Sequence, residues 1–171
     1  MRAIGFDPGT AAAGWGVVEL SGGRLRHVAH GVIATGPEDA MPVRLAYLYK
    51  CVDELLTDYH PDCVCVERLF FKQNVTNGIT VAQARGVILL AAAQRDLPIG
   101  EFSPTEAKTA VTGYGRAEKR QVQEMTRLLL GLEERPRPDD AADALALAIC
   151  MLQNRSGLPF PSIPPGRKDR P

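Results

Sequence analysis

The sequence predicts an α/β domain with a mixed five-stranded sheet and helices on both faces. Three observations lead to this fold class. In the first third of the chain, apolar and polar residues alternate as they do in short strands joined by a glycine turn. The remainder alternates between helical and short apolar segments, and one apolar run, Cys63–Val66, is hydrophobic on both faces, as in a buried parallel strand. At 171 residues, one such domain needs no disulfide to hold its core.

The N-terminal third is expected to form three antiparallel strands over residues 2–7, 14–20 and 25–33. Ser21-Gly22-Gly23 is a turn signal between the last two strands. A helix is expected over residues 43–59, because leucine, valine and tyrosine recur there at the spacing of one apolar helix face.

Helices and strands are expected to alternate after this helix. The sequence predicts a strand over 62–67, a loop over 69–78, a helix over 79–95, a strand over 98–102, and helices over 104–112, 118–130 and 139–154. Ser103-Pro104-Thr105-Glu106 has the pattern of a helix start, with proline at the first helical position. A strand meander followed by this alternation fits an RNase H-like fold.

Residues 1–154 are therefore predicted to form the folded domain, and the proline-rich basic segment 155–171 is predicted to be a disordered tail. Twenty basic and twenty acidic residues balance, which argues against a non-specific DNA coat but not against a local phosphate-binding face. No apolar run approaches the ~20 residues of a membrane span, and no signal peptide precedes the first strand. We expect a cytoplasmic protein.

Cysteine and histidine give no sign of a zinc site. The four cysteines fall within predicted helices and strands and form no CxxC pair, so we expect buried free thiols. His27, His30 and His60 are too scattered to form a zinc site.

Acidic residues, in contrast, occupy positions that do not fill a core. Asp7 and Glu67 each close an apolar strand, and Asp140 and Asp143 are spaced i, i+3 on one face of the last helix. If the two strands are adjacent and parallel, their carboxylates emerge at one sheet edge. Gathered together, the four acids would repel unless cations lay between them, and oxygen ligands favour Mg²⁺ or Mn²⁺. Such a set can hold two ions about 4 Å apart for phosphoryl chemistry, and no organic cofactor is expected.

Each acidic segment also has a simpler interpretation. Asp7-Pro8-Gly9-Thr10 alone could be only a turn. Asp139 and Asp140 could merely cap a helix and favour its dipole, and Asp139 could compete with Asp140 as a ligand. Asp143 lies past the helix start among small residues, so a capping role explains it poorly. Glu67 follows four apolar positions, so a purely structural role explains it poorly as well.

Taken together, these segments resemble the RuvC family of Holliday-junction resolvases, the crossover junction endodeoxyribonucleases. The likeness covers about residues 1–154 and lies in five segments: Asp7-Pro8-Gly9-Thr10, Gly14-Trp15-Gly16, Glu67, Gln83-Ala84-Arg85-Gly86 and Asp140-Ala141-Ala142-Asp143-Ala144-Leu145-Ala146. The resemblance implies a homodimeric endonuclease that nicks two opposed strands of four-way junction DNA in recombination and repair. It also implies that Asp7, Glu67, Asp140 and Asp143 are metal-binding catalytic acids, and that RuvA–RuvB branch-migration proteins are partners.

Seven aromatic and basic residues near these acids are candidates for DNA contact: Phe70, Phe71, Lys72, Arg85, Lys108, Arg116 and Lys119. The resemblance implies a wedge aromatic at Phe70 and basic positions at Lys108 and Lys119. The alternatives are that the two phenylalanines cover the core, that the lysines are ordinary solvated side chains, and that Arg85 orients Glu67 rather than reaching DNA.

Two other functions remain open from the sequence. Gly5-Phe6-Asp7-Pro8-Gly9-Thr10 is similar to the phosphate loop of sugar- and acetate-kinase-like phosphotransferases, although those enzymes enclose ATP between two such domains. A non-catalytic junction-binding module would share the fold but lack an acid, and none is missing here.

Overall fold

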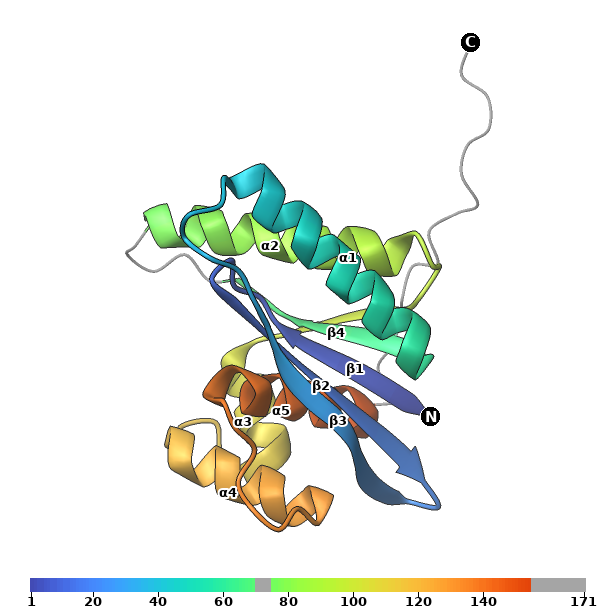
Figure 1. Ribbon diagram of the computed structural model, residues 1–171. Coiled ribbons are helices and arrows are strands. Elements are labelled where there is room, and N and C mark those ends of the chain that lie inside the picture. The colour runs from blue at the N-terminus through green and yellow to red at the C-terminus, as the bar shows by residue number, and fades with distance from the viewer. Residues whose placement is uncertain (70–74, 155–171) are drawn as a thin grey trace.

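A five-stranded mixed sheet runs through the centre of the molecule (Figure 1). The computed structural model describes residues 1–69 and 75–154. The strands are β1 (Arg2–Asp7), β2 (Ala12–Ser21), β3 (Arg24–Ala34), β4 (Cys63–Glu67) and β5 (Ile99–Phe102). Their order is β3-β2-β1-β4-β5, with β1 antiparallel to β2 and parallel to β4. The predicted fold class is confirmed.

Helices cover both faces of the sheet, as expected. In Figure 1, α1 (Met41–Tyr59) and α2 (Val75–Ala93) lie on one face, and α3 (Pro104–Thr112), α4 (Lys119–Leu130) and α5 (Asp139–Gln153) lie on the other. Each face has its own apolar core. The core beneath α5 is the one that supports the acids of the last helix, because nearly every α5 residue after Asp143 is buried.

One predicted boundary is wrong. The helix expected over 79–95 begins at Val75 and ends at Ala93, so residues 75–78 are helical rather than part of a loop. Gly78 is a poor helix former, but its cost within a helix is only about 1 kcal/mol relative to alanine.

The start of α3 follows the sequence prediction closely. The Ser103 hydroxyl accepts a hydrogen bond from the Glu106 backbone N–H at 3.2 Å, and the Glu106 carboxylate accepts one from the Ser103 N–H at 2.7 Å. This reciprocal cap satisfies two N–H groups that the helix itself leaves unpaired. The helix ends at Gly113, whose φ of 75° is left-handed.

The cysteine prediction is also confirmed. Cys63, Cys65 and Cys150 are buried, Cys51 is half-buried, and all four are free thiols. The Cys65 thiol donates to the Leu147 carbonyl of α5 at 3.2 Å. Among the described residues, no helix combines the length and apolar character that crossing a membrane would require.

Candidate active site

Two of the predicted acids are brought together by the pairing of β1 with β4. These strands run parallel, and Phe6 lies opposite Val66. Asp7 and Glu67 follow those residues directly, so both carboxylates leave the sheet at the same edge. The sequence predicted this arrangement on the condition that the strands were adjacent, and the register satisfies that condition.

Glycines on β1 and β2 let α5 approach the same edge. A Cβ atom at Gly5 would lie 2.1 Å from the Ala144 carbonyl oxygen, and one at Gly14 would lie 2.1 Å from the Asp140 carbonyl oxygen. Both contacts are with helix backbone, which cannot move aside unless the helix moves. Since Gly14 pairs with Asp7, the close approach places the first turns of α5 beside the β1 carboxylate. This role of Gly14 has no local signal in the sequence, because it depends on the distant α5.

All four predicted acids line one cavity. The cavity has a volume of about 410 Å³, and its polar lining residues are Asp7, Glu67, Lys108, Lys119, Asp140 and Asp143. Ala146 and Leu147 of α5 form part of its apolar floor. Strand ends, the last helix and the α3–α4 pair therefore each contribute polar side chains to a single site.

Asp7, Glu67 and Asp143 hold their protons unusually well. Burial, with the charges of Glu67, Asp143 and Asp140, raises the pKa of Asp7 to about 8. Burial and Asp143 also raise the pKa of Glu67, while Lys108 opposes the change. Burial raises the pKa of Asp143 despite the nearby Lys119 ammonium. Positive charge is needed here before all the acids can be ionised together.

Lys119 supplies part of that charge. Its Nζ lies 3.4 Å from an oxygen of Asp143 and 3.2 Å from an oxygen of Asp139. Burial disfavours the Lys119 ammonium, but these two carboxylates outweigh that effect and raise its pKa. A solvated lysine with no partner, the simpler alternative for this residue, is not what the structure contains.

The structure also distinguishes Asp140 from its neighbour Asp139. Asp140 lines the cavity and its charge acts on Asp7. Asp139 is exposed and accepts a hydrogen bond from the Gln123 side chain at 2.7 Å. Hydrogen bonds from Lys119 and Gln123 hold the pKa of Asp139 below its ordinary value. The contact with Gln123 had no signal in the sequence.

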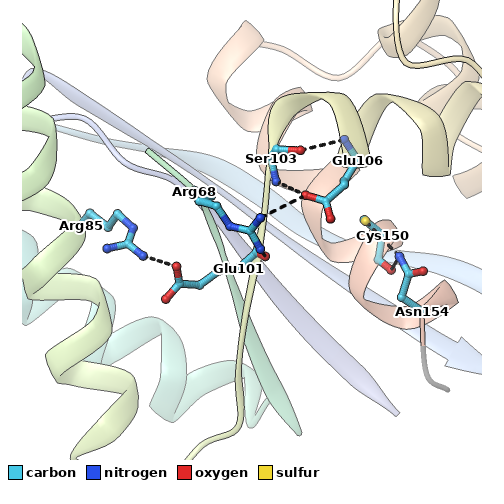
Figure 2. Close-up of polar contacts among 7 residues, drawn as sticks. All are labelled: Arg68, Arg85, Glu101, Ser103, Glu106, Cys150 and Asn154. Atoms are coloured by element: carbon cyan, nitrogen blue, oxygen red, sulfur yellow. Dashed lines mark hydrogen bonds and ion pairs between the residues drawn. The ribbon is translucent and has the colours of Figure 1, made fainter. Parts of the chain in front are cut away.

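Arg85 lies in a network behind the site rather than in the cavity. Its Nε donates to the Glu67 backbone carbonyl at 3.2 Å, and its guanidinium pairs with Glu101 of β5. Figure 2 shows this pair and its continuation, in which Arg68 donates to the Glu101 carbonyl and reaches Glu106 at the start of α3. The contacts match the alternative in which Arg85 orients Glu67.

Of the remaining candidates for DNA contact, the structure describes Arg116 but not the three residues at 70–72. Arg116 is exposed between α3 and α4 and does not line the cavity. Phe70, Phe71 and Lys72 lie outside the described residues.

The donor set fits hard divalent cations. Carboxylate oxygens are the ligands that Mg²⁺ and Mn²⁺ prefer, and the raised pKa values show that added positive charge is favourable here. Among the described residues, no three acidic, thiol or imidazole groups lie close enough together to hold a metal ion as they stand. An open arrangement suits Mg²⁺, which keeps several waters and takes ligands from substrate phosphates. Fold and site together fit divalent-metal-dependent phosphoryl chemistry on an RNase H-like fold.

Comparison with known proteins identifies the family. The family described as "Crossover junction endodeoxyribonuclease RuvC" matches residues 3–151. The RuvC of Rubrobacter xylanophilus is 58% identical over 147 residues, covering 86% of this chain and 82% of that relative. The RuvC of Brevibacillus brevis is 51% identical over 168 residues, covering 98% and 99%. The structure titled "T. thermophilus RuvC in complex with Holliday junction substrate" superposes with a TM-score of 0.84 at 36% identity, covering 88% and 92%. The chain belongs to the RuvC family.

Membership in this family distinguishes between the three functions that the sequence left open. The relatives are nucleases by name and match almost the whole chain. These matches support the endonuclease over both the phosphotransferase and the non-catalytic module.

Proposed function

We propose that this chain resolves four-way DNA junctions by hydrolysing one phosphodiester in each of two opposed strands, with two Mg²⁺ or Mn²⁺ ions per subunit. The observation that carries the proposal is the single cavity where four carboxylates from β1, β4 and α5 meet two lysines. The junction-bound relative from Thermus thermophilus supports the choice of substrate.

Each polar residue of the cavity has a role in this proposal. Asp7, Glu67, Asp140 and Asp143 hold the ions, which when bound supply an activated water and neutralise charge on the phosphate. The exposure of Asp139 and its bonds to Lys119 and Gln123 support Asp140 as the ligand instead.

The two lysines lie where a scissile phosphate would enter. Lys108 and Lys119 both line the cavity, so their ammonium groups can neutralise phosphate oxygens beside the acids. Lys119 would exchange its carboxylate partners for a phosphate oxygen when the ions are present, because the ions then compensate Asp143.

Cleavage of a mobile four-way junction tests the activity. With Mg²⁺ or Mn²⁺ we expect paired nicks at symmetric positions, and with EDTA we expect none, because the carboxylates then lack the charge that holds them ionised together. A duplex of the same sequence, assayed under the same ions, is the control and should remain uncut. Cleavage in EDTA, or equal cutting of the duplex, would contradict the proposal.

A homodimer is part of the proposal, since a four-way junction offers two equivalent cleavage points. The exposed face of the α1–α2 layer supports it. Among the side chains that the structure describes, that layer has four exposed large apolar ones: Val43, Tyr47, Ile79 and Leu90. Apolar side chains gathered on one layer are typical of a surface that is covered in solution.

Charge placed on this layer should separate the subunits. We expect Ile79→Glu combined with Leu90→Glu to shift the protein from dimer to monomer in analytical ultracentrifugation, because each glutamate would be buried without a partner. Leu128→Glu on α4, where the leucine is exposed to a similar extent, is the matched control and should leave the mass unchanged. If the double variant stays dimeric, the interface lies elsewhere.

The family resemblance also supports a place for the enzyme in the cytoplasm beside RuvA–RuvB. Copurification of the three proteins on junction DNA, compared with RuvA–RuvB on the same DNA without this chain, tests that part of the proposal.

A further inference from the structure

We propose that the DNA strand cut at the metal site continues along a groove between α4 and the segment that leads into α5, where Arg137 and Arg120 bind phosphates that flank the scissile one. The inference rests on the proposed function, because it extends the same site along the same substrate. Neither arginine is among the seven residues that the sequence indicates for DNA contact.

Three adjoining cavities form this groove, and neighbouring cavities share a lining residue. The cavity of the metal site adjoins a second one, of about 660 Å³, through Asp140, which lines both. Gln123 and Arg137 also line the second cavity, which adjoins a third one, of about 510 Å³, through Arg135. Arg120 of α4 lines the third cavity. The surface is therefore hollowed from the metal site past Arg137 to Arg120.

Most of the acids that line the groove already have a positive partner or would gain one. An oxygen of Asp139 lies 3.2 Å from the Lys119 ammonium nitrogen, and Glu124 pairs with Arg135 at 2.8 Å. Asp140 is a proposed metal ligand, so a bound ion would compensate its charge. These carboxylates therefore do little to repel a phosphate.

Arg120 and Arg137, in contrast, have charge to spare. Both are exposed, and within the part of the chain that the structure describes neither forms an ion pair. Among the described acids of the second and third cavities, Glu118, the N-cap residue of α4, alone has neither a basic partner nor a proposed ion. With ions at the metal site, the groove has two free positive charges against one negative charge, which favours a polyanion.

The backbone on either side of Arg137 is restrained by prolines. Pro136 is buried, and Pro138 is the N-cap residue of α5. Proline fixes its own φ and restricts the residue before it to extended conformations. A bound phosphate must therefore order only the arginine side chain, which lowers the entropic cost of binding. The planar guanidinium also matches the paired oxygens of a phosphate.

A strand that is cut at the metal site must leave it on both sides. Successive phosphates of one strand advance by only about 3.4 Å along a DNA duplex. Because Asp140 lines both the metal site and the second cavity, a phosphate close to the scissile one comes within reach of Arg137. Phosphates carry no base identity, so the groove contributes affinity and direction rather than sequence preference.

Junction binding in Mg²⁺, followed by fluorescence anisotropy, tests the groove, with Asp7→Asn in every protein so that the DNA stays intact. We expect Arg137→Gln to weaken binding about tenfold and to reduce the slope of log affinity against log salt by about one, as the loss of one phosphate contact should. Arg120→Gln should act in the same way. Arg137→Lys keeps the charge and should keep the slope. Arg24→Gln removes an exposed arginine at the β2–β3 turn, far from the Asp7 end of the sheet, and is the matched control.

The outcomes separate this inference from the proposed function. If the wild type does not cut a junction, the proposed function is wrong, whatever the arginines contribute to binding. If the wild type cuts but Arg137→Gln keeps the full salt slope, Arg137 contacts no phosphate, and if Arg120→Gln keeps it, the strand does not follow α4; either result overturns the inference. Mn²⁺ binding to the DNA-free protein gives an independent check. Arg137→Gln should bind Mn²⁺ like the wild type, and a loss would show that Arg137 acts on the metal site instead of on DNA.

Discussion

Asp7→Asn is expected to abolish junction cleavage and at the same time to stabilise the metal-free protein at pH 8. Asp7 is the acid whose pKa burial and three neighbouring carboxylates raise furthest, to about 8. An amide is a poorer ligand and carries no charge to hold a cation. Since metal stabilisation of a transition state contributes several kcal/mol, we expect a loss of about a thousandfold or more.

The stability change follows from the direction of the pKa shift. Asp7 has a pKa near 8 in the folded protein and an ordinary value of 3.8 otherwise. Its protonated form therefore favours folding below about pH 4, and that contribution disappears as the pH rises through 8. The metal-free wild type should lose stability over this interval. Asn cannot ionise, so the variant should be more stable at pH 8 by several kcal/mol, since a tenfold change in an ionisation constant corresponds to about 1.4 kcal/mol.

Chemical denaturation with EDTA at pH 5 and pH 8 measures this effect. Mg²⁺ should restore stability to the wild type at pH 8 and have little effect on the variant. Asp139→Asn is the matched control, because Asp139 is exposed outside the cavity, and it should retain most of the cleavage. Cleavage by Asp7→Asn at the wild-type rate, or a loss of stability at pH 8, would contradict the account of the site.

Gly14→Ala is expected to destabilise the protein by about 3 kcal/mol and to impair metal binding, because it adds a methyl group where α5 touches the sheet. The new Cβ would lie 2.1 Å from the Asp140 carbonyl oxygen and 2.9 Å from the Asp140 Cβ. This steric overlap can be relieved only if the start of α5 moves away from β2. That movement would carry Asp140 away from Asp7, which pairs with Gly14.

Gly86→Ala is the matched control for this prediction. A Cβ at Gly86 meets no atom within 4 Å, and alanine is the better helix former by about 1 kcal/mol. Denaturant unfolding and Mn²⁺ titration should show losses at Gly14 and none at Gly86. Unimpaired Mn²⁺ binding by a folded Gly14→Ala protein would show that α5 can shift without moving Asp140 from the site.

Much of the site could be anticipated because its signals are local. Asp7 and Glu67 each follow an apolar strand directly, and strand ends are recognisable from residue alternation. The i, i+3 spacing of Asp140 and Asp143 defines one helix face without reference to the rest of the fold. The helix start at Val75 could not be predicted, because residues 75–78 have loop-like composition.

The other parts of the site depend on contacts between distant segments. Lys119 could have been solvated, and Arg85 could have faced DNA, until the positions of Asp143 and of the Glu67 carbonyl were known.

The sequence alone determined which side chains could bind metal, because strand ends and helix faces follow from residue order and the fixed geometry of the backbone. Only the tertiary structure decided how near those side chains come to one another. Asp140 reaches Asp7 because glycines at 5 and 14 let α5 rest directly on the sheet. Such approaches are set by the shapes of surfaces in contact, and a linear pattern of residues does not contain that information.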